Sequence, residues 1–574
     1  MKLIIREYLA SLREREELDA ILPVLVSELG YTVFSSPQRG TRQHGVDVAA
    51  VGDHNGERKV FLFTIKKGDL TRQDWNGDVQ AVRPSLEEIE DVYIPTKIPP
   101  GYKDLKVVIV ICFGGEVREA VRAELTGYTT RKTTDTLSFE EWNGDVLASH
   151  LLAGVLREEV LPKAWRSSFQ KAVALLDEPD ASYRHFATLL RQMDISASAP
   201  AKDRVRAARQ IYLSLWIMYV WARDVGNLEA PYRASELAVL HAWELVKPEI
   251  GASTEAGEAL ATVLVQLINV HQSIASGLID EKITPLASSR HALSVAVGSR
   301  NPVDVNLKLF EALGRLAMLG MWHAWSAGIG DEAHKEKSMK AAQERFDKGV
   351  AMIRSNPHLL LPVCDSQATD VALFLVLWLT AGGDRAGVVY WLTSMAQRLN
   401  FGVRTRSAYP ITSNDYRDLL LHPKDKSDEY FKQNTAGSTL IPLLTAWLSG
   451  MAEAEASDAL GKLAREKLEH CTMQLWLPDE SSDQHLYLNT STHGRGLTDL
   501  DVADGSGLIS TIAAAVDEKR DCTALSAFQT GNWPIILLAC RHWRLPVPPD
   551  FWISALSPDA ADNPTDGAPD EDAS

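Results

Sequence analysis

The sequence has few cysteines, and none of them lie in a spacing that could form a structural zinc site. Five cysteines are scattered over 574 residues, from Cys112 to Cys540, without a CxxC pair. Scattered cysteines without a disulfide framework are typical of proteins from a reducing compartment. We therefore expect a cytoplasmic protein.

The sequence also lacks a recognisable export signal or a long apolar run. The first residues, "MKLIIREYLASLREREEL", carry charges every few positions and contain no apolar stretch followed by a small-residue cleavage site. The longest apolar run, at 371–383, is followed by Asp384 and is shorter than the roughly 20 residues that span a bilayer. This run predicts a buried helix, and no membrane partner is expected.

Three enzyme motifs are absent. No GxxxxGK[ST] occurs, so the chain encodes no phosphate-binding loop of an ATP- or GTP-driven motor. GxSxG and HExxH are missing as well, which removes the usual signatures of serine hydrolases and zinc proteases. A partner would have to supply any nucleotide hydrolysis.

Positive charge is scarce overall. The net charge of −17 argues against adhesion of the whole surface to nucleic acid. A local basic patch can still bind phosphate, because charges act over only about 8 Å at physiological salt. Part of the acidity lies in 557–574, which we expect to be a disordered acidic tail.

The chain is long enough for several domains, and its patterning changes near residue 162. In 1–162, helical and strand patterns alternate, with "KVVIVICF" at 106–113 reading as a buried central strand. This pattern predicts an α/β domain around a mixed sheet. In 163–556, long amphipathic helical patterns dominate and no fixed repeat is visible, which predicts an irregular α-helical region of one or two subdomains.

Two neighbouring strand patterns carry unusual charges. "GVDVAAV" places Asp47 among valines, and "KVFLFTIKK" ends in Lys66 and Lys67. A carboxylate within a strand is costly to bury unless it is paired or binds a metal ion. Two adjacent strands could bring Asp47 and Lys66 to one end of the sheet, where a carboxylate can hold Mg²⁺ and a lysine can stabilise phosphoryl charge. A plain cross-strand ion pair is the alternative.

The order helix, "ELGYTVFSS", "HGVDVAAV", loop, "KVFLFTIKKGD" resembles the PD-(D/E)XK restriction-endonuclease-like superfamily, and within it the Mrr-like enzymes. The resemblance covers about the first 160 residues. It implies a restriction-endonuclease-like fold with Asp47 as a metal ligand, Lys66 as the catalytic lysine and Asp19 as a helical acid that also binds the metal. The implied cofactor is Mg²⁺ or Mn²⁺, and the implied partner is nucleic acid, DNA rather than RNA.

One position departs from the family pattern. Where the family has Glu or Gln, this chain has Thr64, whose hydroxyl is a poorer Mg²⁺ ligand but can hold a metal-bound water. Three interpretations stay open: a weakened active site that includes Thr64, a site completed by Asp69 or Glu17, or a fold that binds without cleaving.

Basic residues surround the same loops and are expected to contact nucleic acid. They are Arg39, Arg42, Lys67 and Arg72, with His44 close by in the sequence. Trp75, which follows, could stack on an exposed base, but packing against a helix is the interpretation we favour.

We therefore expect a metal-dependent nuclease whose helical region serves as a sensor, regulatory or oligomerisation module, similar to stand-alone bacterial anti-phage effectors. One alternative is a catalytically inactive nucleic-acid-binding or scaffold protein. Another is that the helical region acts as a protein-interaction platform, with the N-terminal domain as an adaptor.

Overall fold

The computed structural model describes residues 9, 18–35, 44–54, 56–78, 81–154, 163–193, 196–422, 424–498, 500–519 and 521–556. The chain divides into two compact units, one of Met1–Ala234 with Thr254–Val263 and the other of Ser235–Ser253 with Leu264–Ser574. The boundary predicted at 162 falls in 155–162, and the predicted tail is 557–574; both lie outside the described residues.

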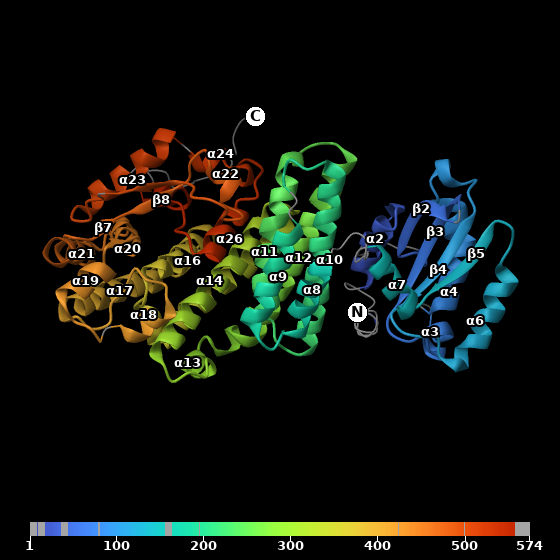
Figure 1. Cartoon of the computed structure of the whole chain (residues 1–574), viewed down its shortest axis with the longest axis horizontal. Helices are drawn as coiled ribbons and strands as arrows, with labels where there is room; N and C mark the ends of the chain where they lie inside the picture. The colour runs from blue at the N-terminus through green and yellow to red at the C-terminus, as the bar shows by residue number, and fades with distance from the viewer. Residues whose placement is uncertain are drawn as a thin grey trace, which may run out of the picture. The chain divides into compact units, whose positions relative to one another are not determined.

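A five-stranded mixed sheet forms the core of the N-terminal part of the first unit (Figure 1). The order is β1-β2-β3-β4-β5, with β1–β2 and β2–β3 antiparallel and β3–β4 and β4–β5 parallel. The strands are β1 (Thr32–Ser35), β2 (Val48–His54), β3 (Glu57–Lys66), β4 (Val107–Phe113) and β5 (Leu137–Trp142). The predicted mixed α/β sheet near the N-terminus is confirmed.

Helices cover both faces of this sheet, which explains the apolar sequence of its central strand. The helices of this part are α2 (Asp19–Glu28), α3 (Arg72–Asn76), α4 (Val82–Glu88), the π-helical turn η2 (Ile89–Tyr93), α5 (Ile94–Lys97), the 3-10 turn η3 (Pro100–Tyr102), α6 (Glu119–Lys132) and α7 (Gly144–Gly154). All seven residues of β4 are buried, as expected for a strand enclosed on both sides.

Different side chains pack against the two faces of the sheet. Leu62 of β3 and Ile111 of β4 share one core cluster with Leu86 of α4 and Leu125 of α6. On the alternate positions, Phe63 makes an edge contact with Trp142, and Trp142 in turn packs against His150 of α7 with the two rings tilted. This is the period-2 alternation of a strand buried on both sides.

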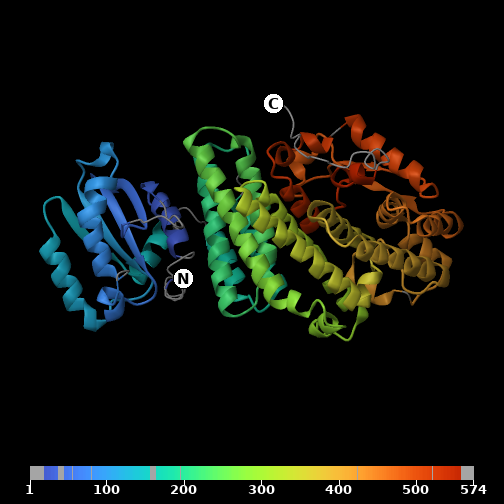
Figure 2. The same ribbon diagram turned by 180° about the vertical axis from the view of Figure 1, so that it is seen from behind.

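Three longer helices complete the first unit before the chain enters α11 (Glu229–Val246) and α12 (Glu255–Lys282), which span both units. They are α8 (Lys163–Ala174), α9 (Pro179–Met193) and α10 (Ala201–Asp224), and α8 and α9 lie side by side (Figure 2). The hydroxyl of Ser182 donates to the carbonyl of Ala172 (2.6 Å), which ties α9 to α8 near their connection.

The second unit is almost entirely helical, as predicted for most of 163–556. Its helices are α13 (Ala292–Ala296), α14 (Pro302–Ala327), α15 (Glu332–Ser355), α16 (Ala368–Ala381), α17 (Arg385–Thr405), α18 (Tyr416–Leu421), α19 (Asp428–Asn434), α20 (Leu440–Gly450), α21 (Ala454–Lys467), α22 (Ser482–His485), α23 (Gly505–Lys519), α24 (Asp521–Ala524), α25 (Ser526–Gln529) and α26 (Pro534–Trp543). The described part also contains four short strands in two pairs, β6 (Gly437–Ser438) with β7 (Thr472–Met473) and β8 (Leu475–Leu477) with β9 (Arg495–Leu497).

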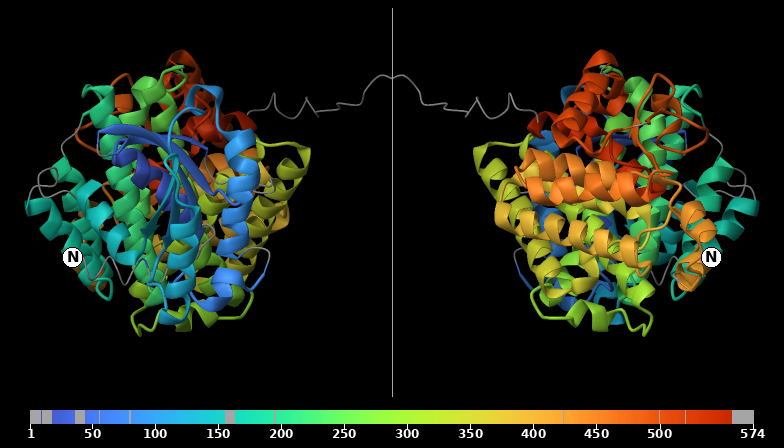
Figure 3. Two further views of the ribbon diagram at one scale, coloured as in Figure 1. Left: turned by 90° about the vertical axis from the view of Figure 1, so that its right-hand side faces the viewer. Right: turned by 90° about the vertical axis from the view of Figure 1, so that its left-hand side faces the viewer.

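Within this unit, α14 packs against α15 and α16, in the yellow-green to yellow region of Figure 3. Residues 368–377 of α16 are all buried, so the long apolar run is a core helix, as predicted. Among the described helices, the stretch Glu255–Leu286 is long and apolar enough to cross a membrane by length and composition, and 56% of its most apolar window is buried by the protein. A core helix passes the same test, so this stretch is weak support for a membrane span.

Candidate functional site

Asp47 lies directly before β2, and both its main chain and its side chain form hydrogen bonds with the main chain of β3. Its amide donates to the carbonyl of Phe63 (2.8 Å), and its Oδ2 accepts a hydrogen bond from the amide of Ile65 (2.7 Å). The side-chain carboxylate therefore occupies a position that a main-chain carbonyl would fill in a regular antiparallel ladder. Burial raises the pKa of the Cys112 thiol, and the negative charge of Asp47 adds to this rise.

Lys66 is the last residue of β3, one position beyond the amide that Asp47 binds. In the parallel register with β4, Lys66 lies opposite Phe113, so it marks the carboxyl end of both strands. Asp47 and Lys66 are thus brought to the same end of the sheet, from adjacent strands. This is the juxtaposition that the sequence predicted.

Thr64 lies two residues before Lys66 on β3, and its side chain is buried in the core. Its side chain is 1% exposed, and it lies opposite Ile111 in the pairing of β3 with β4. Alternation along β3 puts Thr64 on the same face as Leu62 and Lys66. The position expected to carry an acid is therefore enclosed and occupied by a small hydroxyl.

The loop that carries Asp47 is fixed to α4. Gly45 has φ +79°, and a Cβ at this position would lie 2.3 Å from the carbonyl oxygen of Ser85. Next to it, Nδ1 of His44 lies 2.9 Å from Oε1 of Glu88. The chain can pass this close to α4 only with a glycine, and the contact sets where Asp47 enters the sheet.

Glu88 was not identified from the sequence. It is 44 residues from His44 along the chain, and nothing in the helical pattern of α4 distinguishes it from its acidic neighbours. Only the folded chain brings this carboxylate to the Asp47 loop.

Asp69, one of the acids that could complete the site, is engaged in a different contact. Its Oδ2 lies 2.5 Å from Nη2 of Arg118, and its Oδ1 accepts from the amide of Glu116 (2.8 Å). These bonds tie the segment after β3 to the segment after β4, where Leu70 and Val117 form an isolated parallel bridge. The other candidate, Glu17, lies outside the described residues.

The predicted nucleic-acid contacts are described only in part. Lys67 is exposed at the end of β3, and Arg72 opens α3 with a side chain that is 79% exposed and 3.8 Å from a carboxylate oxygen of Glu124. Arg39 and Arg42 lie outside the described residues. Lys67 and Arg72 therefore place two exposed positive charges shortly after Lys66 in the chain.

The predicted metal ligands are likewise described only in part. Asp19 is the first residue of α2, but its side chain is not among those described. Within the described residues, no group of three His, Cys, Asp or Glu side chains is placed to hold a metal ion. Mg²⁺, however, usually keeps several waters and is bound by one or two carboxylates together with substrate phosphates. Asp47 fits this open kind of coordination, and it does not form a closed cage.

Trp75 is a core residue, as predicted. Its side chain is 1% exposed and makes an edge contact with Tyr128, with ring centroids 5.7 Å apart. A ring enclosed in this way cannot stack on an exposed base.

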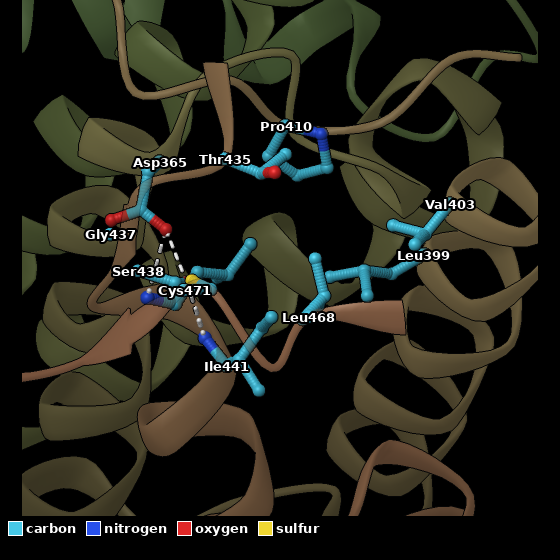
Figure 4. Close-up of a pocket in the computed structure, with 11 residues that line it drawn as sticks. Asp365, Leu399, Val403, Pro410, Thr435, Gly437, Ser438, Ile441, Leu468 and Cys471 are labelled. Atoms are coloured by element: carbon cyan, nitrogen blue, oxygen red, sulfur yellow. Dashed lines mark hydrogen bonds between the residues drawn. The ribbon is translucent and has the colours of Figure 1, made fainter. Parts of the chain in front are cut away.

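A pocket in the second unit has about 330 Å³ of space, part of it open to solvent (Figure 4). Leu399 and Val403 of α17 line its apolar side. At its polar end, Asp365 accepts from the amides of Thr439 (2.7 Å) and Leu440 (3.2 Å) at the start of α20. The carboxylate therefore holds the end of a helix, and the polar end of the pocket has a structural explanation.

Comparison with family models, with curated proteins and with solved structures finds no match for this chain. The arguments about its function therefore depend on its own residues.

Proposed function

We propose that the N-terminal part of the chain is a restriction-endonuclease-like domain and that the protein is a Mg²⁺- or Mn²⁺-dependent nuclease, acting on DNA in preference to RNA. The observation that carries this proposal is the placement of Asp47 and Lys66 at one end of adjacent strands, with the Asp47 carboxylate bonded to the Ile65 amide. The order of three antiparallel strands followed by two parallel ones agrees with the order of elements that the resemblance implies.

The two residues have different roles in this proposal. Asp47 is held in one orientation by the Ile65 amide and by the fixed loop at Gly45, so its carboxylate is pre-positioned. A bound Mg²⁺ would polarise the scissile phosphate and lower the pKa of a bound water. Lys66 would offset the negative charge that develops on the phosphate during attack. The exposed Lys67 and Arg72 would contact neighbouring phosphates.

The sharpest test is Asp47→Asn. The asparagine side-chain oxygen can still accept from Ile65, so folding is retained while the negative charge is lost. We expect Asp47→Asn and Lys66→Met to abolish Mg²⁺- or Mn²⁺-dependent cleavage of plasmid DNA without changing the melting temperature by more than a few degrees. Asp47→Ala is a poorer variant because it also removes the acceptor of a backbone N–H, at a cost of about 1–3 kcal/mol.

Full cleavage activity in a folded Asp47→Asn or Lys66→Met variant would contradict the assignment. An RNA substrate of the same length, assayed beside the DNA, decides between the two nucleic acids.

A second candidate function is nucleic-acid binding without cleavage. The burial of Thr64 supports it, since the position between Asp47 and Lys66 offers no second carboxylate. A native protein that binds DNA but does not cut it with Mg²⁺ or Mn²⁺, and that gains cleavage on Thr64→Glu, would favour this alternative.

The other assignments extend the same proposal. We place the protein in the cytoplasm as a defence-type effector, with the helical region 163–556 as a sensor or regulatory module or as the surface for a partner protein or a second copy. Size-exclusion chromatography with light scattering tests self-association directly.

A further inference from the structure

Positive charge is concentrated in one helical segment of an otherwise acidic chain. Residues 163–224, which contain α8, α9 and α10, have 10 Lys and Arg against 6 Asp and Glu, a net charge of +4. The whole chain carries −17, and 235–574 alone carries −15, with 28 basic and 43 acidic residues. The segment therefore differs in sign from both the whole chain and the long region that follows it.

The exposed basic residues of α9 and α10 lie in helical rows. Arg184 and Arg191 are seven residues apart on α9, and Lys202 and Arg206 are four apart on α10, so each pair lies on one side of its helix. All four side chains are exposed. Seven residues of helix advance about 10 Å, a spacing over which a nucleic-acid backbone presents several phosphates. The four residues thus form one row on each of two helices, and we call the two rows together the α9–α10 basic surface.

The apolar residues of the same helices point elsewhere. Phe186 and Leu190 of α9 and Ala207 and Ile211 of α10 are buried. The basic rows are therefore the solvent side of helices whose other side forms the core. This leaves the basic side accessible.

The four charges of this surface form no close ion pair with a described carboxylate, although Arg206 is near enough to Glu28, the partner of Arg209, to oppose the rise in pKa that burial causes in that carboxyl. Among the described residues, no carboxylate lies within salt-bridge distance of Arg184, Arg191, Lys202 or Arg206. The nearest exposed acid in sequence is Asp203, beside Lys202. In contrast, Arg233, which follows in α11, is paired with Asp180 at 2.5 Å.

We propose that the α9–α10 basic surface binds the phosphate backbone of nucleic acid, as a second contact besides the strand end at Lys66. This inference rests on the proposed function for the identity of the ligand, but it does not depend on cleavage. A membrane is a poorer partner, because none of the large exposed apolar side chains of the described part lies in α8, α9 or α10, so these helices lack the apolar contribution that strengthens binding to a lipid surface.

The test is a binding measurement with the full chain in EDTA, so that no metal-dependent cleavage occurs. The variant carries Arg184→Gln, Arg191→Gln, Lys202→Gln and Arg206→Gln together. The probe is a short fluorescein-labelled DNA duplex of random sequence, followed by fluorescence anisotropy between about 50 and about 200 mM NaCl. We expect the dissociation constant to rise at least about 10-fold and the slope of log K against log salt to become shallower by ~2–4, since each lost phosphate contact contributes about 0.9.

The matched control removes four charges from the second unit. The exposed lysines of α15 serve for this purpose: Lys335, Lys337, Lys340 and Lys348, each changed to Gln. We expect this control to bind the duplex like the native chain. Circular dichroism of both variants shows whether folding is retained.

Three results would overturn the inference: equal affinity in the basic-surface variant and the native chain, equal losses in the two variants, or a loss of binding to phosphatidylglycerol vesicles without a loss of DNA binding. A separate cleavage assay with Mg²⁺ keeps the two proposals distinct. If the native chain binds DNA through this surface but never cuts it, the nuclease proposal fails and the binding surface stands.

Discussion

Thr64→Glu is the substitution that tests most directly whether Asp47 faces a cation site. The Thr64 side chain is 1% exposed, between Phe63 and Ile65 and across from Ile111. Glutamate there would add two heavy atoms to a closed space and a second carboxylate beside Asp47. Overpacking alone costs about 1–3 kcal/mol, and an unpaired buried charge adds several kcal/mol unless the group takes up a proton.

In EDTA we therefore expect the free energy of unfolding of the first unit to fall by roughly 3–5 kcal/mol, a large part of the roughly 5–15 kcal/mol of an ordinary domain. A divalent cation held by the two carboxylates would reverse much of this loss. Binding at a free concentration of 100 times the dissociation constant stabilises the native state by about 2.7 kcal/mol. The assay is scanning calorimetry of the native chain and the variant, with EDTA or with millimolar Mn²⁺.

Thr64→Gln is the matched control, because it brings nearly the same volume without the charge. We expect Mn²⁺ to raise the melting temperature of Thr64→Glu clearly more than that of Thr64→Gln. Equal responses of the two variants to Mn²⁺ would refute the reasoning, since residue 64 and Asp47 would then not share a cation position.

Two other predictions concern the loop and the helical unit. Gly45 and Gly56 both have φ +79°, but a Cβ at Gly56 has nothing within 4 Å. Gly56→Ala should therefore lower the free energy of unfolding by about 1 kcal/mol, and Gly45→Ala by a further 1–3 kcal/mol because its Cβ clashes with α4. Equal midpoints of urea unfolding for the two variants would contradict this. Burial lowers the pKa of the His271 imidazole from 6.5 to about 4. Between these pH values the imidazole is therefore protonated in the unfolded chain and neutral in the folded chain. The contribution of neutral His271 to the free energy of unfolding is complete above pH 6.5 and is lost as pH falls towards 4, by at most about 1.4 kcal/mol per pH unit. His271→Gln should therefore flatten the fall in the urea midpoint between pH 7 and pH 5. An unchanged slope would show that other groups cause the fall in stability.

Much of the sheet was predictable because its strands carry strong local patterns. The run at 106–113 is apolar throughout, and it forms the fully buried β4. The helical segment between β3 and β4 is less regular, since α4 ends at Glu88 and the π-helical turn η2 follows. Pro95 has no N–H to donate to the preceding turn, and a widened turn before it accommodates this loss.

The candidate site was predictable only where it depends on neighbouring strands. Asp47 directly precedes β2 and Lys66 ends β3, and the two strands are joined by a hairpin, so alternation and strand order were enough to bring these residues together. The contact of His44 with Glu88 and that of Asp69 with Arg118 join residues more than forty positions apart, through packing that no local pattern encodes. The burial of Thr64 also depends on the helices that cover its face of the sheet.

The hydrogen bond from Ile65 to Asp47 gives the site a built-in reporter. The chemical shift of this amide proton depends on how much electron density the carboxylate keeps, and its exchange rate depends on how firmly the carboxylate is held. A cation or phosphate that approaches Asp47 would therefore alter the resonance of a single main-chain nitrogen inside β3. Nuclear magnetic resonance with ¹⁵N label on isoleucine alone could follow occupancy of the site without any substrate turnover.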